Sequence, residues 1–128
     1  MRKPRVVVES PLTGNFARNQ RYARLCAIDC MRKNEAPFAS HLLYTQLLND
    51  ATPEDRKLGM ECGFAWGESA ELCAVYVDLG VSGGMREGIL RATKIGIPVE
   101  HRNLPPDLMA QLDAPAPVSL RPTDGAHR

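Results

Sequence analysis

The chain has 128 residues, of which 44% are apolar and 24% charged, and its formal net charge is +1. This length supports one domain with a hydrophobic core, and the composition is that of an ordinary globular protein. The near-neutral charge argues against a surface for long nucleic acid or an anionic membrane. The apolar runs are too short for a membrane span or a secretory signal, so we expect a cytoplasmic protein.

Elements of the N-terminal part follow from apolar patterns and capping residues. Arg5–Glu9 (RVVVE) is a β-branched run typical of a buried strand. Asn15 suits the N-cap of a helix over 16–33, where apolar residues recur at helical spacing. Residues 38–43 predict a second strand, and 44–51 fit either a loop or a short helix.

A second long helix is predicted from Thr52-Pro53 to about Ser69, because threonine suits the N-cap and proline the first helical position. Within it, three glycines are spaced by four: Gly59, Gly63 and Gly67. Glycine is a poor helix former, so this stripe indicates close packing against a neighbouring element or, alternatively, a ligand near the helix. The adjacent Trp66 fits the core or an interface.

The C-terminal part predicts a third buried strand over 72–77 and a helix that starts at Ser82 or Gly83 and stops before Gly96. A fourth strand follows over 97–100, and Pro105-Pro106 opens a short helix at most.

From Asp113 onward the sequence becomes proline-rich with few large apolar residues. We therefore expect one domain over 1–112 and a disordered or loosely attached tail over 113–128.

The alternation of strands and helices predicts an α/β fold: a single Rossmann- or flavodoxin-like domain with a parallel sheet of four to five strands and helices on both faces. Ligands of such sheets bind outside the carboxyl ends of the strands, where the strand order reverses. If the first and third strands are neighbours there, two loops meet: residues 10–15 (SPLTGN) and 78–84 (DLGVSGG).

The second of these loops has the character of an anion site. Gly80, Gly83 and Gly84 permit close backbone approach, Ser82 adds a hydroxyl, and the following helix presents free N–H groups suited to phosphate. The spacing matches neither a dinucleotide fingerprint nor a P-loop, so we expect no cofactor. The alternative reading is a tight strand-to-helix turn with Ser82 as its N-cap.

Two carboxylates accompany this loop. Glu87, early in the helix, can simply complement the helix dipole, but Asp78 ends the preceding strand and would point toward the same cleft. Two acids in one partly desolvated site separate in pKa, and an ionised glutamate can then attack an anomeric carbon or activate water there.

The first loop forms the expected second wall. Ser10 and Thr13 offer hydroxyls, Gly14 offers backbone access, Pro11 stiffens the loop and Asn15 caps the next helix.

Two further residues follow from the segment SHLLYTQ, where His41 and Tyr44 could reach a base or sugar. His41 can equally be structural, because the sequence shows no catalytic or metal-ligating partner for this single histidine. The three histidines are scattered and the four cysteines form no C-x-x-C pair, so we expect free thiols and no metal.

These residues resemble the nucleoside 2-deoxyribosyltransferase-like superfamily over about residues 6–104. The features that carry the resemblance are the strand leading into SPLTG, the strand ending in Asp78, the Ser82-Gly83 loop, Glu87, Ala92 and the GIPV run at 96–99. The segments SPL-x-G, HLLYTQ and D-x-G-x-S-x-GM, the last ending at Met85, match a branch of small bacterial and phage proteins in particular.

The resemblance implies a homo-oligomer with sites near the subunit interface that hydrolyses or exchanges the N-glycosidic bond of a nucleoside or nucleotide. It implies Glu87 as nucleophile and Asp78 as its partner. Sugar or phosphate contacts would come from Ser10, Gly14, Ser82 and Gly83. The loop departs from the glycine-threonine that the transferases carry ahead of the glutamate. Two alternatives stay open. One is a catalytically inactive nucleotide-binding or sensing module, with a phage-related role as one option. The other is an interaction protein whose glycine stripe and Trp66 serve oligomer packing.

Overall fold

The structure is a computed structural model that describes residues 2–121. Four parallel strands form a sheet in the order β2-β1-β3-β4. The strands are β1 (Arg5–Glu9), β2 (Ala36–Phe38), β3 (Leu72–Tyr76) and β4 (Val99–Arg102). The predicted α/β fold with a parallel sheet is confirmed, and β1 and β3 lie side by side at the point where the strand order reverses.

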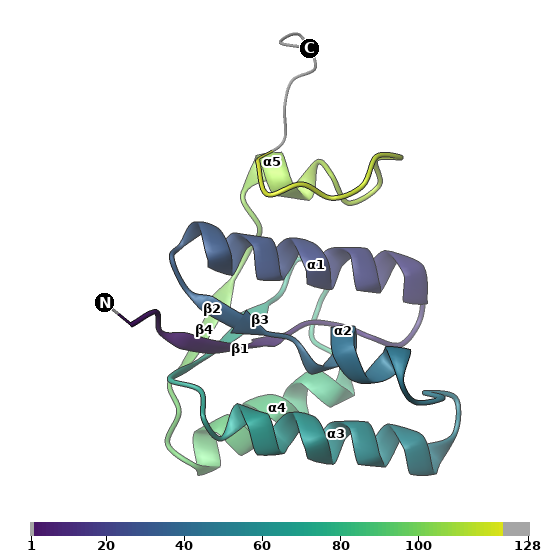
Figure 1. Cartoon of the computed structure of the whole chain (residues 1–128), viewed down its shortest axis with the longest axis vertical. Helices are drawn as coiled ribbons and strands as arrows, with labels where there is room; N and C mark the ends of the chain where they lie inside the picture. Colours follow the sequence, from purple (N-terminus) through teal and green to yellow (C-terminus); the bar gives the residue numbers. More distant parts are fainter. Residues whose placement is uncertain (1, 122–128) are drawn as a thin grey trace, which may run out of the picture.

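Helices cover both faces of this sheet (Figure 1). The chain leaves β1 toward β2 through a helix on one face and then crosses back to β3 and β4 on the other, as right-handed crossovers require. On the first face lie α1 (Phe16–Arg32) and α5 (Pro106–Met109); on the second lie α3 (Pro53–Gly67) and α4 (Gly83–Lys94), with α2 (Ser40–Leu43) beside them.

Side chains of the central strand β1 alternate between the two faces. Val6 and Val8 are buried in the core beneath α1, whereas Val7 contacts the smaller core beneath α4. This alternation sends Glu9, two residues after Val7, to the α3/α4 face.

The predicted helix starts are confirmed in atomic detail. Each N-cap side chain accepts a hydrogen bond from a backbone N–H of the first turn: Asn15 from Arg18, Thr52 from Asp55 and Ser82 from Met85.

The predicted second strand over 38–43 is wrong. Strand β2 pairs with β1 only over Ala36–Phe38 and lies at the sheet edge, where Pro37 is tolerated. The chain then turns into α2, which lets Leu42 pack against the core beneath α1 while His41 faces the opposite side of the sheet. Residues 44–46 form a 3₁₀ turn, and β4 begins two residues later than predicted.

The segment 113–121 is folded back along α1, so the prediction of a loose tail from Asp113 is wrong for these residues. Arg18 pairs with Asp113 at 2.9 Å, and Gln111 accepts from the Ser119 N–H at 2.8 Å. Val118 and Leu120 pack against the core beneath α1. The rest of the predicted tail, 122–128, lies outside the described residues.

The cysteines are free, as predicted: Cys26, Cys30 and Cys73 are buried and Cys62 is partly exposed. Among the described residues, no helix has both the length and the apolar character needed to cross a membrane.

Candidate functional site

A cavity of about 540 Å³ lies on the α3/α4 face of the sheet. This volume is within the range of small-molecule sites, roughly 300–1,000 Å³. Its walls come from the end of β1, the loop after it, the α2 region, one side of α3 and the first turns of α4.

The two loops selected from the sequence meet at this cavity. Ser10, Leu12 and Thr13 line it from the loop after β1, and Ser82 lines it from the loop after β3. The remaining members of the first loop do not line it: Pro11 is buried, Gly14 adopts a left-handed conformation with φ of 102°, and Asn15 caps α1. These three residues shape the loop and do not face the cavity.

The N-terminus of α4 opens into the cavity through Ser82, Gly83, Gly84 and Met85. The Ser82 hydroxyl accepts from the Met85 N–H and the Ser82 carbonyl accepts from the Arg86 N–H. The amides of Gly83 and Gly84 precede these and have no intrahelical acceptor. Both glycines are exposed, and apart from their chain neighbours and the helix backbone no atom lies within 4 Å of the position that a Cβ would occupy at either one. This end of the helix is therefore open to a ligand.

Glu87 lies one turn further along α4, exposed at the cavity rim. The structure does not bring Asp78 to it: Asp78 is absent from the cavity lining and its carboxylate is on the α1 face of the sheet. The predicted pairing of Asp78 with Glu87 in one cleft is therefore wrong.

The Asp78 carboxylate is bound by groups of the opposite face. It accepts from the Tyr22 hydroxyl at 2.5 Å, the Leu104 N–H at 3.0 Å and the Asn103 amide at 3.0 Å. Burial favours its neutral form, but these hydrogen bonds outweigh burial and hold the pKa of Asp78 below its ordinary value. Asp78 joins β3, α1 and the segment after β4, which is a structural role.

Glu9, the last residue of β1, lines the cavity on the strand side, and our sequence prediction missed it. The sequence feature that could have identified Glu9 is the alternation of side chains along RVVVE, which places Glu9 on the same face of the sheet as Val7. Burial raises the pKa of Glu9 from 4.5 to about 8, so the carboxyl is protonated at neutral pH. No described residue donates a hydrogen bond to it or accepts one from it.

Beside Glu9, Ser10 and His41 form a polar pair on the cavity wall. The Ser10 hydroxyl and His41 Nε2 share a hydrogen bond of 2.6 Å. Burial lowers the pKa of His41 from 6.5 to about 4, so the imidazole is neutral at neutral pH. Thr45 donates to the His41 carbonyl at 2.6 Å and fixes the backbone of α2.

The glycine stripe of α3 faces both a neighbouring element and the cavity. A Cβ at Gly63 would lie 2.7 Å from the Ser40 Cβ, so α2 approaches α3 closely there. All three stripe glycines also line the cavity. Close packing therefore accounts for Gly63, and the space beside the stripe belongs to the candidate site.

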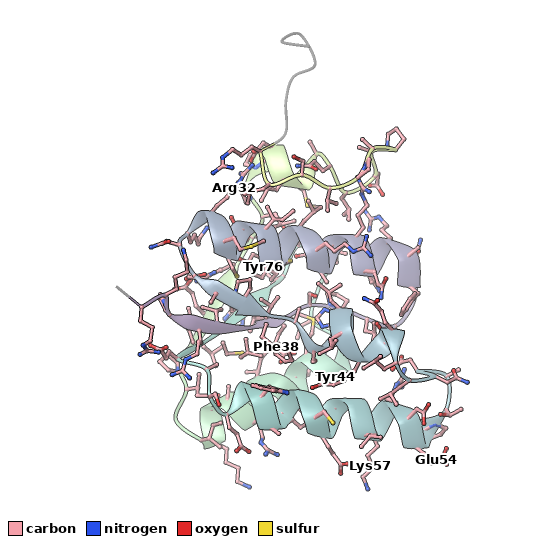
Figure 2. All side chains as sticks on the ribbon, viewed as in Figure 1. Arg32, Phe38, Tyr44, Glu54, Lys57 and Tyr76 are labelled. Atoms are coloured by element: carbon pink, nitrogen blue, oxygen red, sulfur yellow. The ribbon has the colours of Figure 1, made fainter. Side chains whose placement is uncertain are left out.

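Aromatic and basic side chains complete the walls. Tyr44 lines the cavity, and its ring lies 6.5 Å from that of Phe38 on the α3 side of the sheet (Figure 2). The Arg91 guanidinium, also on the lining, stacks over Phe64 at 5.1 Å and pairs with Glu68 at 2.6 Å. These groups present a stacking surface and a cation to the same cavity.

Fold and cavity define the class: a Rossmann-like α/β domain with a cleft where the strand order of its parallel sheet reverses. The chain belongs to the family described as a domain of unknown function (DUF7768), whose model matches residues 4–102. The match includes every residue that lines the cavity and ends with β4. No curated protein matches the sequence significantly.

Proposed function

We propose that this cavity binds a nucleoside or nucleotide and that the protein cleaves or exchanges its N-glycosidic bond. Four carboxyl residues line the cavity: Glu9, Asp50, Asp55 and Glu87. The observation that carries the proposal is that two of them, Glu9 and Glu87, lie beside the open N-terminus of α4, with Glu9 packed against Gly88 and Glu87 in the second turn of the helix. Glycosidic bond cleavage uses two carboxyl groups in different roles. A helix N-terminus suits the phosphate of a nucleotide.

Each part of such a substrate meets groups of matching chemistry. The free amides of Gly83 and Gly84 suit a phosphate, and Ser10 and His41 suit the hydroxyl groups of a sugar. Tyr44 offers an aromatic ring to a base. These matches support a nucleotide over an apolar ligand of the same size.

In the proposed reaction Glu87 attacks the anomeric carbon or activates a water molecule that does so. The bond between that carbon and the base breaks, and its electron pair leaves on the base nitrogen. Transfer to a second base or to water completes the cycle. The resemblance to nucleoside 2-deoxyribosyltransferases supports this role for Glu87.

The test is to incubate the protein with each deoxynucleoside and each deoxynucleoside monophosphate and to measure free base and base exchange by chromatography. Glu87→Gln should reduce the rate by about 100-fold or more. Glu54→Gln, which changes an exposed glutamate of α3 that does not line the cavity, is the matched control and should keep the rate. Absence of release and exchange with all substrates would overturn the enzymatic proposal.

A second candidate function is nucleotide binding without turnover. It is favoured by the exposure of Glu87 at the rim and by the distance of Asp78 from the cavity, which leaves Glu87 without its expected partner. Calorimetry measures the affinity for a deoxynucleoside monophosphate, and chromatography measures released base. A protein that only binds should show affinity without base release, and Glu87→Gln should keep that affinity.

We further propose that the protein is a cytoplasmic homo-oligomer. Trp66 and Leu90 are 63% and 69% exposed on α3 and α4, which are the helices that form the cavity rim, and a second copy would cover them. The buried free thiols are consistent with a reducing compartment. Light scattering should give a mass of at least two chains, and Trp66→Glu should reduce it to one.

A further inference from the structure

Glu9 is distinguished first by its position in the strand. Val6 and Val8 point into the core beneath α1, while Glu9 ends β1 on the cavity face. Its main chain pairs with Val75 in the centre of the sheet, so the residue is held on a rigid element. A carboxyl group at this place is a fixed part of the cavity wall.

The space for this carboxyl exists because α4 has no side chain at Gly88. A Cβ built at Gly88 would lie 2.2 Å from Glu9 Oε2 and 2.4 Å from Cδ. Gly88 is buried in the middle of a helix, where glycine is a poor helix former. The Glu9 carboxyl therefore packs directly against the α4 backbone, one residue from Glu87.

Glu9 also differs from the other carboxyl groups in the interior because it has no protein partner. Asp29 accepts from the Tyr76 hydroxyl, Glu35 pairs with Arg102, and Asp78 has three donors. No described residue forms a hydrogen bond with the Glu9 carboxyl, which borders the open cavity instead. Glu9 is partly buried, and its carboxyl is open to the cavity, where a ligand can bind it.

We propose that Glu9 is the general acid of this site and donates its proton to the departing base. This inference rests on the proposed function and gives the role expected of Asp78 to a residue that borders the cavity. Burial keeps the Glu9 carboxyl protonated at neutral pH, as a proton donor must be.

The proton balance of the step is complete. As the glycosidic bond breaks, the Glu9 proton moves to a ring nitrogen of the base, which leaves neutral, and Glu9 becomes a carboxylate. The anomeric carbon forms its new bond to the Glu87 carboxylate or to a water oxygen whose proton Glu87 accepts. In hydrolysis one water molecule is consumed, and proton exchange with solvent restores the protonated Glu9.

The test compares Glu9→Gln with wild type on two substrates. Deoxyguanosine monophosphate needs a proton on its leaving base, whereas its N7-methylated form already carries a positive charge and releases a neutral base without one. We expect the variant to lose about 100-fold or more on the first substrate and less than about threefold on the second. Equal losses on both substrates would overturn the assignment and leave the proposed function intact.

A second readout does not depend on turnover. The carbon-13 resonance of one glutamate carboxyl should titrate near pH 8 in wild type and be missing in Glu9→Gln, whose neutral amide preserves the shape of the protonated acid. If all glutamate carboxyl groups titrate in the ordinary range, Glu9 is not a proton donor, whatever the protein cleaves. Base release by neither form of substrate, with the resonance near pH 8 present, would instead overturn the proposed function.

Discussion

Glu9 and Asp78 lie at the carboxyl ends of neighbouring parallel strands, yet they differ in the face of the sheet, in hydrogen-bond partners and in the direction of their pKa shifts. Asp78 is on the α1 face, accepts three hydrogen bonds and has a lowered pKa. Glu9 is on the α3/α4 face, has no described partner and has a pKa raised to about 8. The protein's own donors satisfy Asp78, whereas Glu9 borders the cavity without a described hydrogen-bond partner.

This difference shows that closeness to the carboxyl edge of a sheet does not make an acid functional. Both residues satisfy the rule that ligands bind at this edge. The face on which the side chain lies, and whether the fold already satisfies it, separate the structural acid from the candidate catalytic one.

The largest expected effect on stability comes from Asp78→Ala. The Tyr22 hydroxyl and the Leu104 N–H would lose their acceptor, so the free energy of unfolding should fall by roughly 2–4 kcal/mol. Urea denaturation measures this. Asp113→Ala, which removes an exposed ion pair with Arg18, is the control and should cost less than about 1 kcal/mol. A fully stable Asp78→Ala protein would show that the hydrogen bonds do not define this residue's role.

The next effect is the pH dependence that Glu9 imposes. Its folded-state pKa of about 8 lies above its ordinary 4.5, so the folded protein keeps a proton that the unfolded chain has lost. Stability from this group is complete below pH 4.5 and falls as the pH rises to 8. Glu9→Gln should therefore unfold at least about 5 °C above wild type at pH 8.5, whereas the difference in unfolding temperature at pH 5 should be small. Thermal scans that give the same gap at both pH values would contradict the raised pKa.

A smaller effect tests the contact between Glu9 and α4. Gly88→Ala gains helix propensity but forces the Glu9 carboxyl aside, for a net loss of about 1 kcal/mol. In a Glu9→Ala background the same change should stabilise by about 0.5–1 kcal/mol, because the obstacle is gone. Additive effects in this double-mutant cycle would mean that the carboxyl does not occupy the space beside Gly88.

The smallest stability effect should come from Glu87→Gln. Glu87 is exposed at the cavity rim, so its unfolding free energy should change by less than about 0.5 kcal/mol. Chemical denaturation of this variant also validates the activity test, since any loss of rate then reflects chemistry and not unfolding. A large destabilisation would place Glu87 among the structural acids with Asp78.

The sequence predicted the sheet and the capped helices because their signals are local. Asn15, Thr52 and Ser82 specify helix starts through contacts three residues away. It failed where the answer depends on distant partners. The turn at α2 depends on α3 packing against Ser40, and the partners that satisfy Asp78 come from α1 and from the segment after β4.

The candidate site was predicted only in part for the same reason. Because SPLTGN and DLGVSGG follow two strands that were expected to be neighbours, the sequence correctly predicted that Ser10 and Ser82 lie on one cavity. Glu9 was hidden within a strand, where only the alternation of side chains marks its face. The contact between Glu9 and Gly88 could not be predicted, because it depends on the packing of α4 against β1, and no local sequence pattern encodes that packing.

The central claim is that a nucleotide binds on the Glu9 side of the sheet and not on the Asp78 side. The most direct measurement is a titration of the nitrogen-15 labelled protein with the four common deoxynucleoside monophosphates, followed by amide chemical shifts. We predict that the amides of Glu9, Ser10, Gly83 and Gly84 shift while those of Asn103 and Leu104 do not. Shifts concentrated at Asn103 and Leu104, or no shift with any of the four at millimolar concentration, would contradict the claim.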